Sequence, residues 1–594
     1  MIRIPLRPLA RVLKARARGE DTHVIEAENL RLRHEAMRDT ARLRAEGRLL
    51  MLGAMFAIAF GIIGMRMGAL ASTAPEEPQA TVLGNPIIGQ RADITDRNGR
   101  ILATNLETHS LYAHPHDMID PVHAANELVL IFPELKHGKL LSEFTGDRKF
   151  VWIRRQISPE QMQLVHDIGC PGLLFGPREM RLYPNGAIAS HILGGASYGR
   201  EGVASAEVIG VAGIEREFDQ LLRDPAREGE PLSLSIDLTV QAAAEEVLAG
   251  GMSIMNAKGA ASILMDLHTG EIISMVSLPD FDPNNRPRVL LTGDQSDSPL
   301  FNRAVQGVYE LGSVFKIFAV AQALELGLLS QDTMVDTQGP LQWGKFSIRD
   351  YRDYGAQLTA TDVVVKSSNI GTARIAMEIG GERQQAFLKS LGFMDATPVE
   401  LSEAPSGAPL LPRNWSEIST MTISYGHGLS SSPLHLASAY ASLLNGGTKI
   451  KPTLLRRSTP QNGPRVIREE ISAQARDMLR QVVLRGTASF VDVEGYNVGG
   501  KTGTADKPKE NGGGYYDNKT ISTFASVFPT NDPKYILIVT FDEPSENSGI
   551  EPRRTAGWTA VPVAAEMIRR TAPLLGLRPQ VDTSSAISVT ITSN

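Results

Sequence analysis

The sequence predicts a multidomain α+β protein that a single helix anchors in a membrane. Its 594 residues are too many for one hydrophobic core, and 42% of them are apolar, as in ordinary folded proteins. One long apolar stretch lies near the N-terminus, and segments with strand patterns flank a long region with helical patterns. The net charge of −6 argues against a broad basic surface, so we expect no nucleic acid partner.

Cysteine usage limits the possible chemistry. Cys170 is the only cysteine, which excludes an intramolecular disulfide. No group of cysteines and histidines has the spacing of metal ligands, so the sequence predicts neither a metal site nor another cofactor. Packing must therefore stabilise the folded domains.

An apolar stretch at 49–71, interrupted only by Arg66, has about the length that a bilayer requires. The residues before it are rich in arginine, whereas residues 72–78 carry only acidic charges. Because positive charge stays on the cytoplasmic side, we expect a transmembrane helix at 49–71 and a basic cytoplasmic leader at 1–48. The bulk of the chain then lies outside the cytoplasm.

The leader from Glu20 to Arg48 is rich in helix-forming residues and contains no proline, so we expect it to be helical. Its arginines could bind anionic lipids or a cytoplasmic partner, but a solvated charged helix explains them equally well. Ala69-Leu70-Ala71 resembles a signal-peptide cleavage site, which leaves a cleaved signal as the alternative to an anchor. The length of the charged leader favours the anchor.

Two folded units and a flexible tail are expected outside the membrane, at 72–234, 235–576 and 577–594. The first is a mixed α+β unit in which no nucleophile with an adjacent base stands out. In the second, strand patterns at both ends enclose helical patterns, which predicts an antiparallel sheet between layers of helices. The predicted strands and last helix of this sheet domain lie at 260–266, 271–277, 521–528, 535–541 and 561–575.

Several residues of the first unit are assigned structural roles. Apolar residues on both sides of Asn98-Gly99 predict a β-hairpin. His191, between small residues, is more typical of a structural hydrogen-bonding residue than of a ligand or base. Arg91, Asp96 and Glu215 are charged residues that could pair across the unit.

Three short motifs occur in order in the second unit, and together they predict a serine acyl-transfer site. Each alone arises often by chance and is more typical of a helix start or a strand–loop junction. Their order and spacing make the joint prediction specific. The motifs are Ser313-Val-Phe-Lys316, Ser367-Ser368-Asn369 and Lys501-Thr502-Gly503-Thr504.

The first motif supplies a nucleophile and a base. A serine hydroxyl needs a base, and a lysine can be that base only in its neutral form, which burial or a neighbouring cation favours. Ser313 and Lys316 are three residues apart, so on a helix Lys316 can approach the Ser313 hydroxyl. At a helix start, the N–H of Ser313 can also stabilise an oxyanion, with the N–H of Thr504 as the second donor.

The other two motifs are predicted to handle the proton and the substrate. The Ser367 hydroxyl can pass a proton toward the leaving group, and the Asn369 amide can hold the substrate. Lys501 supplies positive charge for a terminal carboxylate. The segment Thr502–Thr504 adds hydroxyl donors and, at its glycine, room for a substrate backbone. These residues imply a peptide substrate that ends in an anion.

A glycine-rich segment at 506–519 follows the third motif and is predicted to be a mobile hairpin beside the site. Its Tyr515 and Tyr516 could contact substrate, although simple surface exposure is the commoner fate of loop tyrosines.

The three motifs resemble those of the penicillin-binding proteins, and specifically of the class B, monofunctional peptidoglycan D,D-transpeptidases. The resemblance extends from Arg91 to about Leu575. It implies the penicillin-recognising serine transpeptidase fold, in which helices sandwich an antiparallel sheet beside an all-helical region, with an N-terminal α+β pedestal of the dimerisation type. The segments similar to that pedestal are 91–103, 181–194 and 213–222.

Two further segments, 424–429 and 432–440, are similar to the division-specific branch of this family. His427 and His435 stand where that branch usually has Tyr and Gln. Leu311 replaces the proline that commonly precedes the Gly-Ser of the first motif, which should leave the turn less rigid without removing a catalytic group.

The resemblance implies cross-linking of peptidoglycan at the division septum. Ser313 would attack the penultimate D-Ala carbonyl of a stem pentapeptide, release D-Ala and pass the acyl group to an amine on a neighbouring stem; beta-lactams would acylate the same serine. It also implies an inner-membrane protein with a periplasmic catalytic domain. The implied partners are a membrane-embedded peptidoglycan polymerase and other division proteins, and no cofactor is implied.

Other functions are weighed as alternatives. An elongation-type class B transpeptidase, or a beta-lactam-binding scaffold or sensor without catalysis, would carry similar motifs. A serine beta-lactamase would need a base that activates water, and Glu400-Leu-Ser-Glu403 lacks the paired Asn of class A enzymes. A bifunctional class A synthase would need a glycosyltransferase domain, for which residues 72–235 are short and lack a suitable acidic motif.

Overall fold

The computed structural model describes residues 7–72, 91–198, 208–509 and 514–580. Residues 73–90, residues 510–513 of the predicted mobile hairpin, and most of the predicted tail, 581–594, lie outside the described residues. The chain divides into two compact units. One contains Met1–Gln79, Leu111–Arg155 and Glu160–Phe175; the other contains Ala80–Ser110, Gln156–Pro159 and Gly176–Asn594.

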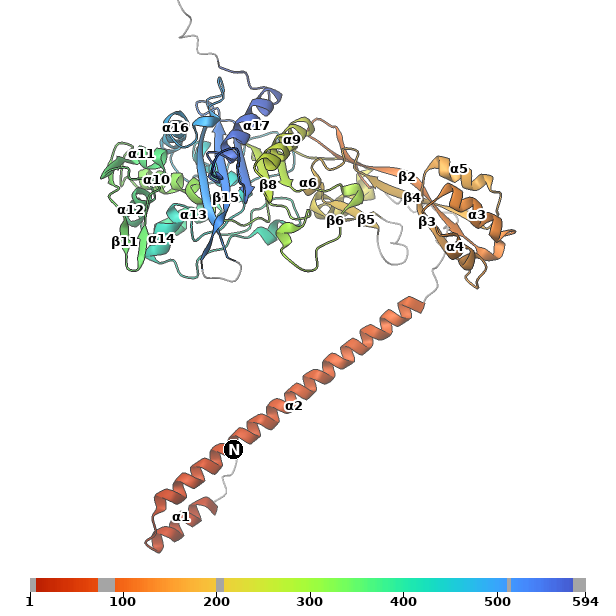
Figure 1. The fold of residues 1–594 in the computed structure, drawn as a ribbon, viewed down its shortest axis with the longest axis horizontal. Helices are drawn as coiled ribbons and strands as arrows, with labels where there is room; N and C mark the ends of the chain where they lie inside the picture. Colours follow the sequence, from red (N-terminus) through yellow and green to blue (C-terminus); the bar gives the residue numbers. More distant parts are fainter. Residues whose placement is uncertain (1–6, 73–90, 199–207, 510–513, 581–594) are drawn as a thin grey trace, which may run out of the picture. The chain divides into compact units, whose positions relative to one another are not determined.

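The N-terminal helices belong to the first of these units. A short helix, α1 (Arg7–Ala17), precedes α2 (Thr22–Ser72), which is drawn as one long rod in Figure 1. The predicted leader helix is therefore confirmed, and it continues into the apolar stretch without a break. Within the described part of the chain, Glu46–Met65 is the one segment long and apolar enough to cross a membrane. Its apolar side chains are exposed, as lipid-facing residues would be.

The remainder of the first unit is a small α/β body. Asp120 starts its first helix by accepting hydrogen bonds from the N–H groups of Val122 and His123. Tyr112, Phe150 and Trp152 pack together with ring centroids 5.1–5.9 Å apart. The elements of this body are α3 (Pro121–Ile131), α4 (His137–Phe144), β3 (Val151–Ile157) and α5 (Pro159–Asp167).

The second unit begins with strands that carry the predicted hairpin. β1 (Ile94–Thr95) pairs antiparallel with β2 (Ile101–Ala113), so the turn at Asn98-Gly99 is confirmed, and β1 also pairs with β7 (Leu232–Ser233). The other elements here are β4 (Leu173–Leu182), α6 (Ser190–Leu193), β5 (Gly195–Tyr198), β6 (Val208–Ala212), α7 (Gly213–Glu217) and α8 (Asp219–Leu222).

A buried ion-pair network joins these elements, as predicted for Arg91 and Glu215. The fully buried Glu215 carboxylate accepts from Arg91 Nε at 2.8 Å and from Arg181 Nε at 2.7 Å. Asp96 is not part of it, because its carboxylate instead accepts from Arg100 Nε at 2.8 Å in the hairpin turn. His191 is buried with Nε2 3.2 Å from the Pro279 carbonyl, and burial lowers its pKa to about 4, which fits a neutral structural residue.

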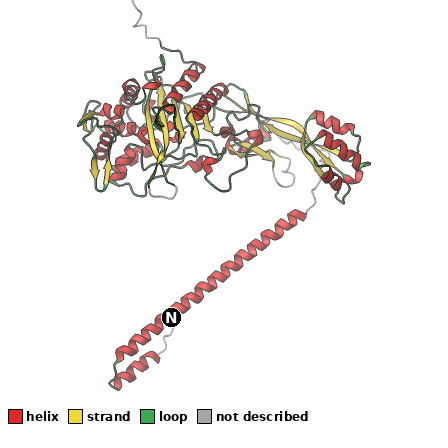
Figure 2. Cartoon of the chain, viewed as in Figure 1, coloured by secondary structure: helices red, strands yellow, loops and turns green. Residues whose placement is uncertain are grey.

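The rest of the second unit is built on a five-stranded antiparallel sheet with the order β14-β15-β16-β8-β9. Helices α9 and α17 pack over β8, β9 and β16, while α15 and α16 pack over β8, β14 and β16. Figure 2 shows the strands in yellow with red helices on both sides. The bounds are α9 (Leu238–Ile254), β8 (Gly259–Asp266), β9 (Ile272–Leu278), α15 (Pro433–Leu444), α16 (Glu469–Arg485), β14 (Gly499–Pro508), β15 (Tyr515–Phe528), β16 (Tyr535–Asp542) and α17 (Ala560–Leu574).

All four predicted strands and the predicted last helix are present in the structure, so these predictions are confirmed. Three of the strands are buried along nearly their whole length. A mostly helical region is inserted between β9 and α15. The elements of this region are α10 (Lys316–Glu325), β10 (Met334–Asp336), β11 (Leu341–Trp343), β12 (Phe346–Ile348), β13 (Gln357–Thr359), α11 (Ala360–Lys366), α12 (Asn369–Ile379), α13 (Gly381–Leu391) and α14 (Glu417–Ser424). The sequence did not reveal its two small strand pairs, β10 with β13 and β11 with β12.

Candidate active site

The first motif lies where a tight turn passes into a helix. Gly312–Phe315 forms a 3₁₀ turn that continues directly into α10, as the predicted helix start requires. Gly312 has φ +63°, and a Cβ at this position would lie 2.6 Å from the carbonyl oxygen of Thr504. Glycine thus lets the turn that carries the half-buried Ser313 pack against β14.

The third motif lies in β14, at the edge of the sheet that faces this turn. Lys501 pairs with Ala525 of β15, and the lysine is fully buried. A Cβ at Gly503 would collide with the Leu311 carbonyl. Gly503 therefore allows a close approach of β14 to the first motif, a role that the sequence prediction, which considered only the substrate backbone, did not include.

The second motif joins two helices. Ser367 ends α11 in the left-handed conformation, with φ +63°, and Ser368 begins α12 by accepting a hydrogen bond from Gly371 N–H at 2.9 Å. A left-handed non-glycine residue costs about 1–3 kcal/mol, so neighbouring contacts must hold it.

Lys316 contacts the second motif through its amine. Its Nζ donates to Ser367 Oγ at 3.0 Å and to Asn369 Oδ1 at 2.7 Å, and it also bonds the Ser367 carbonyl oxygen. Lys501 Nζ reaches the same hydroxyl, at 3.0 Å from Ser367 Oγ. The Ser367 hydroxyl therefore lies between two lysine amines that come from a helix and from a strand.

Burial changes the protonation of both amines. It lowers the pKa of Lys316 well below the ordinary value, and the nearby Lys501 lowers it further, whereas Asp350 opposes this change. Burial also lowers the pKa of Lys501, to about 7. A neutral lysine base next to a second amine that titrates near neutrality is thus available, as the motif chemistry requires.

The predicted approach of Lys316 to the Ser313 hydroxyl does not take the form of a hydrogen bond within the described residues. The recorded hydrogen bonds of Lys316 Nζ go to Ser367 and Asn369, and none of those within the described residues goes to Ser313 Oγ. Ser313 nevertheless lies one residue from the contact between Gly312 and Thr504. Catalytic hydrogen bonds often tighten only when substrate is bound, so the base role of Lys316 stays a prediction.

The side chains predicted to bind substrate also have partners within the protein. Asn369 Nδ2 donates to the Arg349 carbonyl at 2.9 Å, so both ends of its amide are held. The Thr502 and Thr487 hydroxyls lie 2.7 Å apart, and Thr504 Oγ1 accepts from Ala556 N–H at 3.0 Å. These contacts fix the orientation of the side chains around the cluster.

Sequence reasoning missed two carboxylates of the site. Asp350 accepts a hydrogen bond from Ser368 Oγ at 2.6 Å, and Glu310 accepts from Gly428 N–H at 2.7 Å and from Tyr515 Oη at 3.1 Å. Tyr515 is therefore hydrogen-bonded to Glu310, close before Ser313 in the chain, and it is not a loop tyrosine that is exposed without any partner. No periodicity or motif marks Asp350, whereas Glu310 lies only three residues before Ser313.

The two histidines that depart from the branch pattern differ in environment. His435 is structural: its Nδ1 lies 2.7 Å from Ser432 Oγ at the start of α15, and its Nε2 lies 2.9 Å from the Asp395 carbonyl. His427 lies beside the rings of Tyr425 and Tyr515, with centroids 5.5 and 6.3 Å away. Burial lowers the pKa of His427, while Glu310 opposes this change.

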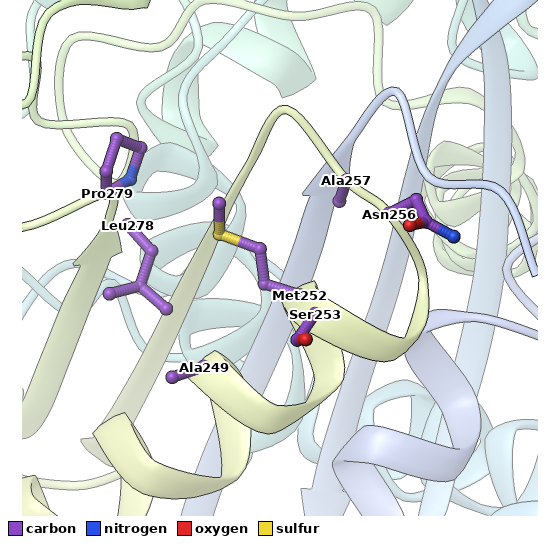
Figure 3. A pocket seen from close by; sticks show the side chains of 7 residues that line it. All are labelled: Ala249, Met252, Ser253, Asn256, Ala257, Leu278 and Pro279. Atoms are coloured by element: carbon purple, nitrogen blue, oxygen red, sulfur yellow. The ribbon is translucent and has the colours of Figure 1, made fainter.

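A pocket elsewhere on the sheet domain lacks comparable chemistry. Figure 3 shows it between the end of α9, at Met252 and Ser253, and the end of β9, at Leu278. None of its seven lining residues is titratable, and none belongs to the three motifs. It offers no nucleophile with a base, so the lysine–serine cluster is the candidate active site.

A serine at a helix start, a lysine three residues later and a second buried lysine that shares the Ser367 hydroxyl with it are the groups that a serine acyltransferase needs. Residues 260–567 match the penicillin-binding protein transpeptidase domain, and residues 86–227 match the penicillin-binding protein dimerisation domain. The chain therefore belongs to the penicillin-binding protein family, as a transpeptidase joined to a dimerisation domain, and the predicted family is confirmed.

Individual relatives agree with this assignment. The chain is 34% identical to the probable peptidoglycan D,D-transpeptidase FtsI of Caulobacter vibrioides, over 93% of each chain. It is 28% identical to the peptidoglycan D,D-transpeptidase FtsI of Escherichia coli K12, over 76% of this chain and 79% of that one. Penicillin-binding protein 3 of Mycobacterium tuberculosis, solved with aztreonam, has a TM-score of 0.62 at 24% identity, covering 83% of this chain and 98% of that one. The predicted fold class is thereby confirmed.

The contact between the first motif and β14 leads to a prediction about Gly312. Gly312→Ala is expected to destabilise the sheet domain more than Gly327→Ala, a matched change at φ +68° where no atom lies within 4 Å of the new Cβ. Both alanines adopt an unfavourable backbone conformation, but only the first meets the Thr504 backbone, which adds about 1–3 kcal/mol. Denaturant unfolding of the two variants measures the difference, and equal losses would contradict the proposed close approach.

Proposed function

We propose that the chain is a peptidoglycan D,D-transpeptidase in which Ser313 is the nucleophile and Lys316 the general base. The observation that carries this proposal is the position of Ser367 Oγ, 3.0 Å from both Lys316 Nζ and Lys501 Nζ. A hydroxyl in this position can relay protons between a base and a leaving group. The relatives named peptidoglycan D,D-transpeptidases support the choice of substrate.

The reaction proceeds by two acyl transfers. Neutral Lys316 takes the proton of Ser313, whose oxygen attacks the penultimate D-Ala carbonyl of a stem pentapeptide. The N–H groups of Ser313 and Thr504 stabilise the oxyanion, which collapses and breaks the amide bond. D-Ala leaves as an amine that receives a proton through Ser367. An amine of a neighbouring stem then attacks the acyl ester; Lys316 takes the amine's proton and returns it to the Ser313 oxygen, so that an amide replaces the ester and Ser313 is released.

The remaining motif residues position the substrate in this proposal. Protonated Lys501 attracts the terminal carboxylate, and the Thr502 and Thr504 hydroxyls complete its binding. Gly503 keeps the strand close to the nucleophile turn, and Asn369 orients Lys316. Beta-lactams acylate Ser313 in this proposal because they present a reactive amide carbonyl next to an anionic group, and the mycobacterial protein was solved in complex with the beta-lactam aztreonam.

The domain boundaries and membrane topology follow the same proposal. β7 at Leu232–Ser233 still pairs with β1, and α9 begins at Leu238, so the pedestal at 72–234 gives way to a transpeptidase domain at 235–576. Residues 1–48 lie in the cytoplasm, 49–71 span the inner membrane, and the catalytic domain and the tail at 577–594 lie in the periplasm. This topology follows from the basic leader and the exposed apolar helix.

Covalent labelling tests the nucleophile. A fluorescent penicillin is expected to label the full chain in detergent, with the adduct mapped to Ser313 by mass spectrometry, and Ser313→Ala is expected to abolish the label. Ser330→Ala, at an exposed serine after α10, is the matched control and should label normally. The label should persist, because no base is proposed to activate water. Rapid loss of the label would instead favour a beta-lactamase, and growth of cells on Ser313→Ala alone would favour a scaffold.

The pH dependence of acylation tests the role of Lys501. Because the pKa of Lys501 is about 7, the amine loses its charge as the pH rises through neutrality. The acylation rate constant for a carboxylate-bearing penicillin is therefore expected to fall above about pH 7, approaching tenfold per pH unit. Lys501→Arg keeps its charge and should remove this decline. A penicillin methyl ester, which lacks the carboxylate, should not show the decline; an identical decline would exclude carboxylate recognition by Lys501.

We further propose that the protein acts at the division septum, beside a membrane-embedded peptidoglycan polymerase and other division proteins. Support comes from the division-type segments at 424–429 and 432–440 and from the two relatives named FtsI. A fluorescent fusion in dividing cells should gather at midcell, and depletion of the protein should give filaments. Fluorescence along the lateral wall, with rounded cells on depletion, would identify an elongation-type enzyme instead.

A further inference from the structure

Asp350 occupies a distinctive place beside the second motif, although it belongs to none of the three. It follows β12, in a loop anchored by Ile348, whose side chain is buried with Ile370 of α12. One carboxylate oxygen accepts from Ser368 Oγ at 2.6 Å. The other accepts from Ile370 N–H at 3.1 Å and from Asn369 N–H. A single carboxylate thus binds three donors at the start of α12.

These donors determine where the catalytic groups of the second motif lie. Ser368 follows the left-handed Ser367, whose hydroxyl lies between the two lysine amines. Asn369 presents Oδ1 to Lys316 while its Nδ2 donates to the carbonyl of Arg349, the residue just before Asp350. The loop therefore holds both the backbone and the side chains of this junction, where Ser367 adopts an unfavourable conformation.

The carboxylate also acts on Lys316 through its charge, since Asp350 raises the pKa of Lys316 against the larger effect of burial. The other titratable groups recorded around this pair are Lys501 of β14, His427 after α14 and Tyr354 of the same loop. Glu310 faces His427, and Arg352 faces Tyr354. A change at Asp350 alone leaves all of these groups in place.

From this geometry, and resting on the proposed function, we propose that Asp350 is a positioning residue of the transpeptidase. It fixes the Ser367–Asn369 junction against Lys316 through the three hydrogen bonds that its carboxylate accepts. Asp350 does not touch the reacting atoms, so it acts through Ser368, Asn369 and the charge it places near the lysine.

The test is the acylation rate constant of the full chain in detergent, measured with fluorescent penicillin from acid to neutral pH. Asp350→Asn is expected to slow acylation by about ten- to a hundredfold, the loss typical of charge-assisted hydrogen bonds. Without the carboxylate charge, the pKa of Lys316 falls further, so its neutral form persists to lower pH. The acid limb of the pH profile, which is the fall of the acylation rate constant as Lys316 becomes protonated, should therefore move to lower pH.

Two further variants distinguish the effects of the charge and the position of the Asp350 carboxylate from a general loss of protein stability. Asp353→Asn makes the same change three residues away, where the carboxylate accepts from Gly355 N–H and from no other group in the described part of the chain, and it should match the wild type in rate and acid limb. Asp350→Glu keeps the charge on a longer side chain, so it should slow acylation but leave the acid limb nearly in place. The labelled fraction at saturation measures the folded population of each variant, which a destabilised fold would lower without moving the acid limb.

The outcomes distinguish this inference from the proposed function. A wild-type chain that takes up no label overturns both. A wild type that labels normally, with an Asp350→Asn variant that acylates at the wild-type rate, overturns the positioning role alone, and an acid limb of Asp350→Asn that coincides with the wild type overturns the role of the charge. An acid limb that moves equally in Asp350→Glu and Asp350→Asn overturns the role of the charge.

Discussion

The site depends on two lysine amines that are buried within hydrogen-bonding distance of one serine hydroxyl. Lys316 and Lys501 both lie in a fully buried environment, where two positive charges cannot be held side by side without a large desolvation cost. The structure meets this constraint by lowering both pKa values, so that a neutral amine exists at physiological pH. Ser367 Oγ, which can accept and donate, is suited to the space between them. The proposed acyl-transfer chemistry follows from this arrangement.

Much of the second unit serves to bring those amines together. One lysine comes from the first turn of α10 and the other from β14, so the sheet and the helical region must meet closely. They can do so because Gly312 and Gly503 have no side chains at the contact, where any Cβ would collide with backbone on the opposite element. Ser367, at the junction of α11 and α12, completes the contact from a third element in a left-handed conformation that glycine usually adopts. Backbone geometry, rather than any single strong interaction, therefore sets the distances at the site.

The sequence predicted those parts of the structure that depend on local pattern. Alternation, apolar runs and turn residues located the hairpin at Asn98-Gly99 and the strands of the sheet, since each reflects local burial. The three motifs identified Lys316, Ser367 and Lys501, which the structure brings together. They could do so because the spacing within each motif is typical of residues on one face of a helix or of residues in a strand. The sequence did not predict that Asp96 pairs with Arg100, because the choice among several charged partners depends on tertiary geometry. Lys316 Nζ donates its hydrogen bonds to the second motif, and none joins it to Ser313 Oγ within the described residues, so its approach to Ser313 stays a prediction.

The carboxylates near the lysine–serine cluster show why the sequence alone did not predict the whole site. Asp350 and Glu310 lie in loops, and each binds partners far along the chain, at Ser368 and Tyr515. A loop residue of this kind has no periodicity to mark it, and its effect on a lysine is visible only when the chain is folded. Yet a negative charge near a buried amine raises the amine's pKa, whereas burial lowers it. The motifs therefore supply the groups that acyl transfer needs, while a carboxylate in a neighbouring loop partly offsets the larger effect of burial on the pKa of Lys316.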